Sequence, residues 1–223
     1  MAKGGYPVED ARKLLLEALD RAIADKRVIE AMTRVPREFF VPEEYRHMAY
    51  EDSPLPIGYG QTISQPYMVA IMLQALEVRR TDRVLEVGTG SGYQASLLAE
   101  LAGEVITVER VPALAETARA TLARLGYSSV RVEPAGEIVG RSEDAPYDCI
   151  VVAAGAPKLM RGLMDQLAVG GRLVMPVGSS KSQELMKVTR SREAYSVVGL
   201  GECRFVPLIG KDAWPDEGSA QES

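Results

Sequence analysis

The sequence predicts an α/β fold with a doubly wound, mostly parallel sheet, an antiparallel edge strand and an N-terminal helical extension. Short apolar runs alternate with helical segments from about residue 84 to residue 177, as in a parallel sheet with helices on both faces. Within this region, the apolar run Val84–Val87 leads through a glycine-rich turn into a helical segment, which is typical of a nucleotide-binding βαβ unit. Two strand-like runs, 184–190 and 195–200, predict a terminal hairpin and therefore the antiparallel edge.

The N-terminal part is predicted to be mainly helical. Apolar residues at helical spacing predict one helix over residues 8–23 and a second, short helix over 26–32. Residues 51–66 have no regular period and are rich in proline and glycine, which predicts a long functional loop. Pro66 suits the first position of a further helix, which we expect to continue to Leu76.

The core elements then alternate along the chain. We expect strands at 84–87, 104–109, 130–133, 147–154 and 172–177, and helices at 95–102, 112–125 and 159–167. Gly126 is expected to end the second of these helices, and Gly170-Gly171 to form a turn. The predicted organisation is an N-terminal extension with a substrate loop (1–76), a ligand-binding core (77–210) and a polar, flexible tail (211–223).

Composition limits the function classes. The net charge is -5 with both signs interspersed, which argues against a nucleic-acid-binding surface. Because no apolar run approaches the roughly 20 residues of a membrane helix and the N-terminus lacks a signal-peptide core, we expect a cytoplasmic protein without a membrane partner. Cys149 and Cys203 have no metal-ligand spacing, so no metal is expected, and Cys149 lies in an apolar strand as an inert thiol. The single histidine, His47, has no visible carboxylate partner and is interpreted as structural or superficial.

The spacing of the glycines after Val87 distinguishes between nucleotide ligands. Gly88, Gly90 and Gly92 form G-x-G-x-G, whereas a dinucleotide fingerprint is G-x-G-x-x-G and would require glycine in place of Tyr93. Glu86, at the end of the strand, would repel a pyrophosphate and suits a cationic or hydroxyl-bearing ligand.

A second acid supports a nucleoside ligand. Glu109 ends the next predicted strand, about 20 residues after the turn, where an acid typically accepts hydrogen bonds from ribose hydroxyls. The predicted ligand is a nucleoside without phosphates that carries a positive charge, namely S-adenosylmethionine. The alternative is an ordinary glycine turn with an exposed Glu109.

The loop before Pro66 contains a second candidate site. A helix N-terminus beside hydroxyl groups favours an anion, because free N–H groups and the helix dipole both attract negative charge. Ser64 therefore has two possible roles, as the cap of the helix or as a ligand of an anionic acceptor, and the residues alone leave both open.

Taken together, the chain resembles the protein-L-isoaspartate O-methyltransferase family. The matching blocks span most of residues 8–210 and are GYGQTISQPYM (58–68), VLEVGTGSGYQA (84–95), VER (108–110), APYDCIVVAA (145–154), DQL (165–167), GGRLV (170–174), MPVG (175–178) and FVPL (205–208). The resemblance implies a Rossmann-like class I methyltransferase sheet and methyl transfer from S-adenosylmethionine to the α-carboxylate of L-isoaspartyl residues in damaged proteins and peptides. The protein is expected to be a monomer.

The resemblance also assigns site residues. The active-site serine of the family falls on Ser64, and Thr62 is a second candidate in the same block. The cofactor-binding candidates lie at the ends of the first three core strands: Glu86, Gly88, Thr89, Gly90, Ser91, Gly92, Glu109, Arg110, Gly136 and Glu137. The family usually has Gly-Asp-Gly after the third strand. Here Gly136 takes the aspartate position, so Glu137 or backbone groups are expected to contact the adenine.

This chemistry needs few catalytic groups. A carboxylate is already ionised near neutral pH and attacks a sulfonium methyl without a general base, so positioning and desolvation remain as the work of the protein. Three alternatives stay open from the residues: a class I methyltransferase with an RNA or small-molecule acceptor, a nicotinamide dehydrogenase, and a non-catalytic binding module that retains the fold.

Overall fold

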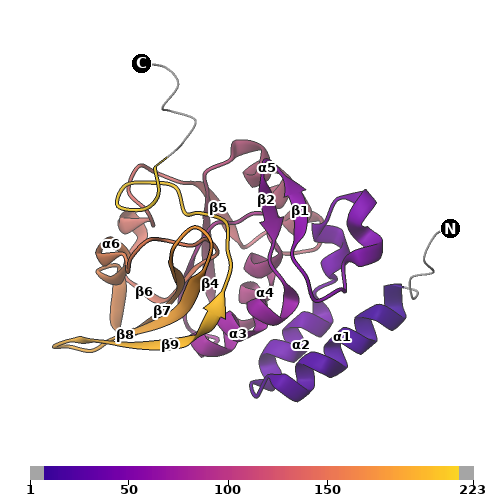
Figure 1. Ribbon diagram of the computed structural model, residues 1–223, viewed down its shortest axis with the longest axis horizontal. Coiled ribbons are helices and arrows are strands. Elements are labelled where there is room, and N and C mark those ends of the chain that lie inside the picture. Colours follow the sequence, from indigo (N-terminus) through magenta and orange to yellow (C-terminus); the bar gives the residue numbers. More distant parts are fainter. Residues whose placement is uncertain (1–7, 216–223) are drawn as a thin grey trace.

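The computed structural model describes residues 8–215 and confirms the α/β fold (Figure 1). The N-terminal part begins with two α-helices and two 3-10 turns, and a short hairpin then leads to a third helix. The elements of this part are α1 (Val8–Ala22), α2 (Lys26–Arg34), η1 (Arg37–Phe40), η2 (Glu43–Met48), β1 (Leu55–Gly58), β2 (Gln61–Ile63) and α3 (Pro66–Leu76).

The core continues as alternating strands and helices and ends in a meander. Its elements are β3 (Arg83–Val87), α4 (Tyr93–Leu101), β4 (Glu104–Glu109), α5 (Pro112–Arg124), β5 (Arg131–Pro134), η3 (Ser142–Asp144), β6 (Tyr147–Val152), α6 (Arg161–Met164), β7 (Leu167–Gly178), β8 (Gln183–Arg190) and β9 (Tyr195–Cys203).

The seven-stranded sheet has the order β5-β4-β3-β6-β7-β8-β9. Strands β5 to β7 are parallel, whereas β8 pairs antiparallel with both β7 and β9. The chain runs outward from β3 through β4 to β5, then returns to β6 on the other side of β3. In such a sheet, ligands bind outside the carboxyl ends of the strands where this order reverses. The topology therefore directs attention to the loops that follow β3 and β6.

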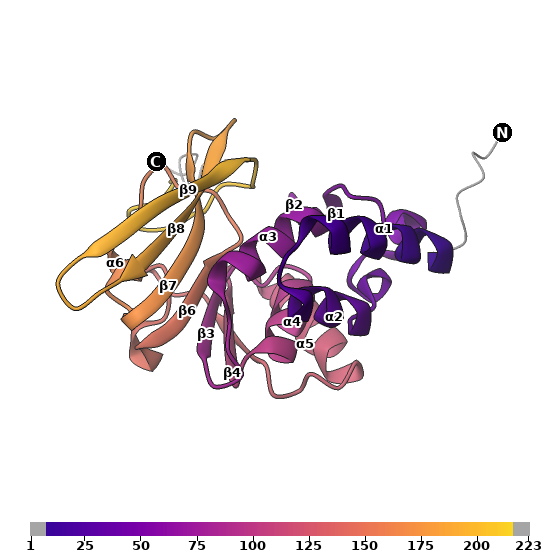
Figure 2. The same ribbon diagram turned by 90° about the horizontal axis from the view of Figure 1, so that it is seen from below.

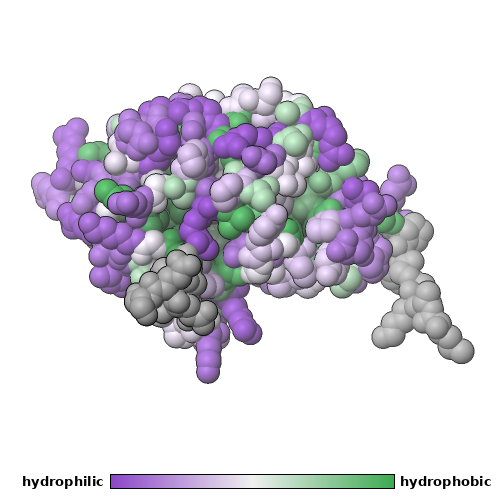
Figure 3. All heavy atoms as spheres, turned by 90° about the horizontal axis from the view of Figure 1, so that it is seen from above, coloured by the Kyte–Doolittle hydropathy of each residue, from purple (hydrophilic) through white to green (hydrophobic). Residues whose placement is uncertain are grey.

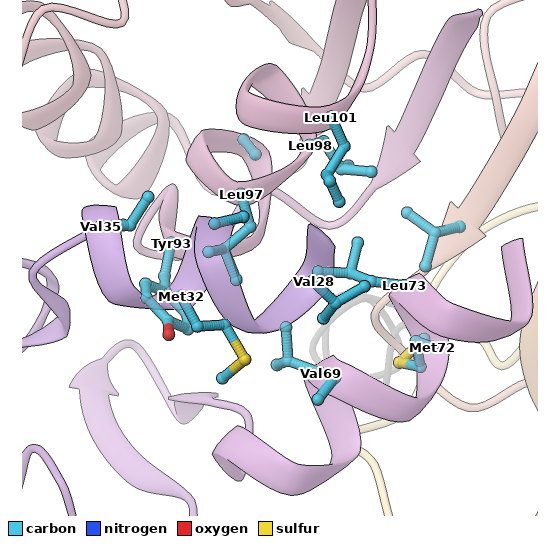
Figure 4. Close-up of a cluster of buried hydrophobic side chains, with 14 of the residues drawn as sticks. Val28, Met32, Val35, Val69, Met72, Leu73, Tyr93, Leu97, Leu98 and Leu101 are labelled. Carbon is cyan, nitrogen blue, oxygen red and sulfur yellow. The ribbon is translucent and has the colours of Figure 1, made fainter. Parts of the chain in front are cut away.

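The N-terminal helices share a hydrophobic core with one face of the sheet. Figure 4 shows α2, α3 and α4 meeting through buried side chains, among them Val28, Val69 and Leu97. Asp25 begins α2 because its carboxylate accepts a hydrogen bond from the N–H of Arg27. Figures 1 and 2 place α1 and α2 at one end of the molecule and the β8–β9 hairpin at the other. The predicted extension is thus packed on the core rather than separate from it.

The other face of the sheet is covered largely by irregular chain. Leu85, Ile106 and Ile150 point into a second core, where they pack with the short helix α6 and with Leu208 of the C-terminal segment.

The surface carries both hydrophobic and hydrophilic residues. Figure 3 shows hydrophobic residues among hydrophilic ones near the centre of one face.

A buried polar network joins α3 to the sheet. The guanidinium of Arg172 donates to the carbonyls of Leu76 and Glu77 and forms an ion pair of 2.8 Å with Asp82. The thiol of Cys149 lies 3.4 Å from the same carboxylate, and burial raises its pKa to about 12. Because the thiolate is the reactive form, Cys149 is inert, as predicted.

Several predicted element bounds differ from the structure. Residues 51–66 contain the β1–β2 hairpin, whose pairing joins Leu55 to Ile63 across a tip of positive-φ residues. The helix predicted over 159–167 is only α6, and Gly170-Gly171 lies inside the long strand β7. The path of the strand requires glycine at 171, because a Cβ there would lie 2.8 Å from the carbonyl oxygen of Ala168 and clash with it.

The C-terminal segment also differs from the prediction. The indole N–H of Trp214 donates to the carbonyl of Gly155, and its backbone N–H donates to Leu208. Residues 211–215, which were assigned to the flexible tail, therefore lie on the core. The rest of the predicted tail, 216–223, lies outside the described residues.

Candidate active site

A cavity of about 630 Å³ opens at the carboxyl ends of β3, β4 and β6, where the strand order reverses. Most of its lining residues come from the β2 segment (61–64), the turn after β3 (86–91), the end of β4 (108–111), the loop after β5 (135–136 and 139–140), the end of β6 (153–154) and the C-terminal segment (206–209 and 214–215). Val69, Tyr93, Gln94 and Ser180 complete the lining. The volume is in the range of cavities that bind cofactors and other small molecules.

The turn after β3 depends on its glycines. Gly88 and Gly90 have φ values of 95° and 53°, in a region of backbone conformation that residues other than glycine rarely adopt. The N–H groups of Gly88 and Thr89 both donate to the carbonyl of Val108, which fixes the turn against β4. A Cβ on Gly90 would lie 3.3 Å from Ile57, so the turn approaches the β1–β2 hairpin closely.

Gly92 has a different role from the other two glycines. It does not line the cavity but precedes α4 as its N-cap, with a φ of 88°. A Cβ at this position would lie 3.3 Å from Leu122 and 3.4 Å from Ala118 on α5. Its structural contribution is therefore close packing between α4 and α5.

Glu109 is buried and bound to the turn. Its Oε2 accepts a hydrogen bond of 2.8 Å from the N–H of Gly90, and its Oε1 accepts one of 2.9 Å from Val111. Only 8% of the residue is exposed, so the alternative of a solvent-exposed Glu109 is wrong. A carboxylate oxygen has two lone-pair directions, so both oxygens retain the capacity to accept from a ligand hydroxyl.

Glu86 lies fully buried at the floor of the cavity. Its Oε2 accepts from the hydroxyl of Thr107 at 2.6 Å, and Thr107 lies 2.7 Å from the hydroxyl of Thr89. Its Oε1 has no hydrogen-bond partner among the described residues. Burial raises the pKa of Glu86 to about 8, while the Thr107 bond opposes this shift and nearby Glu109 adds to it. A buried acid with an unmatched oxygen fits a ligand that brings a positive donor.

Ser64 lies directly after β2, in the segment that leads to α3. The helix α3 begins with Gln65 as N-cap and Pro66 as first residue, and the N-cap side chain makes no capping bond. Asp52 instead accepts from the N–H of Tyr67 at 2.8 Å. Ser64 does not act as the helix cap, so the capping role considered from the sequence is wrong. Ser64 and Thr62 both line the cavity.

The remaining predicted residues are divided between the cavity and the surface. Thr89, Ser91, Arg110 and Gly136 line the cavity, whereas Glu137 is exposed and is not among the lining residues. His47 is exposed and also outside the cavity, in agreement with the superficial role predicted for it.

Sequence reasoning missed one wall of the cavity. Apolar surface is contributed by Val206, Pro207, Leu208, Ile209 and Trp214. The FVPL block is visible in the sequence but contains no chemistry of its own, and Trp214 was placed in the tail. Tyr93 and Gln94 at the start of α4 also line the cavity.

Residues 8–215 contain no group of three or more His, Cys, Asp or Glu side chains arranged to hold a metal ion. None of their helices is long and apolar enough to span a bilayer.

Comparisons with known proteins agree on one family. The model of the family described as protein-L-isoaspartate(D-aspartate) O-methyltransferase (PCMT) matches residues 10–213. Protein-L-isoaspartate O-methyltransferase 2 of Marinobacter nauticus is 52% identical over 219 residues, which cover 96% of this chain and 100% of the relative. Protein-L-isoaspartate O-methyltransferase of Methanoculleus marisnigri is 52% identical over 199 residues, with coverages of 89% and 90%.

A solved structure supports the same comparison. A Plasmodium falciparum protein described as a beta-aspartate methyltransferase (PCMT), in complex with S-adenosyl-L-homocysteine, has 27% sequence identity and a TM-score of 0.75. The match covers 87% of this chain and 96% of the solved chain.

Proposed function

This chain belongs to the protein-L-isoaspartate(D-aspartate) O-methyltransferase family, and from that premise we propose that it methylates the α-carboxylate of L-isoaspartyl residues in damaged proteins and peptides. The comparisons confirm the resemblance drawn from the sequence, and the enzyme is a methyltransferase dependent on S-adenosylmethionine.

The cavity residues fit S-adenosylmethionine. We propose that Glu109 accepts from the ribose hydroxyls; its position at the end of β4 and its bond to the turn support this. The proposed role of Glu86 is to accept from the cationic methionyl part of the ligand through its unmatched Oε1. For the adenine we propose contacts with backbone groups around Gly136, since Glu137 lies outside the lining. When bound, S-adenosylmethionine supplies an electrophilic methyl group on a sulfonium.

Ser64 and Thr62 are proposed to hold the acceptor. Their segment lies in the same cavity as the glycine turn, so an acceptor carboxylate bound there faces the donor. A hydroxyl hydrogen bond orients a carboxylate without removing its negative charge, which the attack requires. No general base is needed, because the acceptor is ionised near neutral pH.

The apolar part of the cavity is expected to favour the reaction. Methyl transfer neutralises the carboxylate anion and the sulfonium cation, so a less aqueous site favours the transition state over the separated ions. The C-terminal residues Val206, Leu208 and Trp214 give the cavity apolar surface that excludes water. All proposed site residues other than Gly92 and Glu137 line one cavity of one chain, which supports activity as a monomer.

The observation that carries the proposal is this single cavity, which joins the acidic ribose and cation sites to the hydroxyl-bearing segment. The test is incubation with methyl-labelled S-adenosylmethionine and two peptides that differ only in isoaspartate or aspartate at one position. Base-labile label on the isoaspartyl peptide alone is expected. Equal labelling of both peptides, or labelling of neither, contradicts the proposed acceptor.

A further inference from the structure

Arg37 lies buried behind the proposed acceptor segment. It begins the turn η1 in the N-terminal extension, and only 1% of the residue is exposed. Its Nη2 donates to the carbonyl of Ser64 at 2.8 Å, and its Nε donates to the carbonyl of Ala49 at 2.9 Å. The guanidinium also lies 4.9 Å from the ring centre of Tyr93, which lines the cavity. Arg37 thus contacts two residues of the cavity wall without lining it.

Among residues 8–215 no carboxylate forms an ion pair with Arg37, although Asp52 acts on its charge from farther away. Its Nη1 has no hydrogen-bond partner among the same residues. The groups that act on it electrostatically are Tyr93, Tyr50 and Asp52, and burial lowers its pKa. Arg172, the other buried arginine, differs because it is paired with Asp82 at 2.8 Å. Burial of a cation without an ion-pair partner costs folding free energy. The positive charge of Arg37 is therefore available to an anion that enters the cavity.

We infer that Arg37 is a positioning residue that fixes the backbone of Ser64 and attracts the ionised acceptor carboxylate into the cavity. The inference rests on the proposed function, since it concerns the same acceptor. Arg37 reaches the site through the Ser64 carbonyl and the Tyr93 ring, so it attracts the carboxylate without a direct contact that would quench its nucleophilicity. At this depth a charge acts over several ångströms because the surrounding dielectric is low.

In this role Arg37 discriminates between substrate and product. Methyl transfer converts the acceptor carboxylate into a neutral ester, so the attraction is present for the substrate and absent for the product. Loss of the charge is therefore expected to raise the KM for the peptide, with a much smaller effect on kcat. A purely structural role would lower the affinity for charged and neutral ligands alike.

The test compares two ligands that differ only in this charge. Calorimetry in the presence of S-adenosyl-L-homocysteine measures the binding of an isoaspartyl peptide and of the same peptide with the α-carboxylate replaced by an amide. In Arg37→Gln we expect the acid to bind about tenfold more weakly and the amide within about twofold of wild type. Arg37→Lys, which keeps the charge, is expected to retain most of the preference for the acid. Equal losses for acid and amide, or an unchanged preference in Arg37→Gln, overturn the inference.

Two controls keep the test decisive. Arg172→Gln removes a buried arginine that binds the C-terminal end of α3, the end of the helix away from Ser64, and is expected to leave the acid preference unchanged. If Arg37→Gln does not fold, Asp52→Asn replaces a nearby negative charge while keeping an oxygen for the Tyr67 N–H. That variant is expected to strengthen the acid preference, and an unchanged preference overturns the inference. Failure of the wild type to methylate the isoaspartyl peptide would instead overturn the proposed function.

Discussion

The carboxylate of Glu109 accepts a hydrogen bond of 2.8 Å from the backbone N–H of Gly90. This contact joins the end of β4 to the turn after β3, so the proposed ribose site and the glycine turn form one unit. The other carboxylate oxygen binds the N–H of Val111 just before α5. Glu109 therefore organises the loops on both sides of the donor site as well as offering oxygens to a ligand.

Replacement of Glu109 is expected to weaken the binding of the cofactor. Glu109→Ala removes the proposed ribose acceptor and also frees the Gly90 N–H. Because a hydrogen bond to a charged group contributes roughly 1.5–3 kcal/mol, we expect a loss of affinity of about 10- to 100-fold for S-adenosyl-L-homocysteine by calorimetry. Glu133→Ala, at the end of the adjacent strand β5 and outside the cavity lining, is the matched control. Unchanged affinity in Glu109→Ala would exclude the ribose role.

Replacement of Ser64 is expected to slow methyl transfer. Ser64→Ala removes the hydroxyl but keeps the backbone carbonyl that Arg37 holds, so the segment should retain its position. Loss of one orienting hydrogen bond, about 1–3 kcal/mol, predicts a decrease in kcat/KM of about 5- to 100-fold, with cofactor affinity unchanged. Ser53→Ala, just before the hairpin and outside the cavity lining, is the control. Wild-type turnover in Ser64→Ala would remove the residue from the mechanism.

Glu86 is expected to make folding stability depend on pH. Its pKa is about 8 in the folded protein, against an ordinary value near 4.5. Between these values the unfolded chain releases a proton that the folded protein keeps, so ionisation progressively favours unfolding as the pH rises. The stability of Glu86→Gln relative to wild type should therefore increase from pH 5 to pH 8, by up to about 1.4 kcal/mol per pH unit. Urea denaturation of both proteins measures this, and a constant difference would show that Glu86 does not carry the shifted pKa.

The same residue is expected to couple cofactor binding to pH. A cationic ligand favours the ionised form of Glu86, so the affinity of the wild type for S-adenosylmethionine should rise between pH 6 and pH 8. Glu86→Gln should lose this pH dependence. Calorimetry in buffers with different ionisation enthalpies would detect the proton released by the wild type, and the absence of release near pH 7 would place the cation elsewhere.

Trp214 provides an intrinsic signal for binding. It is the single tryptophan of the chain, it lines the cavity, and its indole N–H donates to Gly155 at 3.1 Å. A ligand that enters the cavity changes the surroundings of the ring, so tryptophan fluorescence should change with S-adenosyl-L-homocysteine and saturate with the calorimetric affinity. Trp214→Phe should abolish the signal while retaining the fold. An unchanged spectrum at saturation would place the ligand away from this wall.

Short sequence patterns predict the elements that carry the glycine turn. The unit from β3 through the glycine turn to α4 follows from an apolar run, positive-φ positions and a helical pattern, all within about 20 residues. The position of Glu109 at the site follows from its place at the end of the next strand, about 20 residues after the glycine turn, because parallel strands end at the same edge of a sheet. The site residues at the strand ends are therefore visible in the sequence.

Other features depend on contacts between distant segments. Asp52 caps α3 in place of Ser64, and no local pattern distinguishes the two. The hairpin β1–β2 is too short to show a period. Arg37 appears as an ordinary surface arginine until the fold buries it behind Ser64.

The polar composition of the C-terminal segment explains why Trp214 was misplaced. A polar stretch after the last strand is typical of a tail, whereas tertiary contacts, among them the bonds that Trp214 donates to the carbonyls of Leu208 and Gly155, hold Trp214 at the cavity. Similarly, Gly170-Gly171 has the composition of a turn, yet β7 continues through it beside β6.

The most direct measurement is a crystal structure of the protein with S-adenosyl-L-homocysteine and an isoaspartyl peptide bound together. We expect the ribose hydroxyls on Glu109, the α-carboxylate at Ser64, and the sulfur facing a carboxylate oxygen across the cavity. A peptide bound outside this cavity, or a carboxylate turned away from the sulfur, would contradict the account.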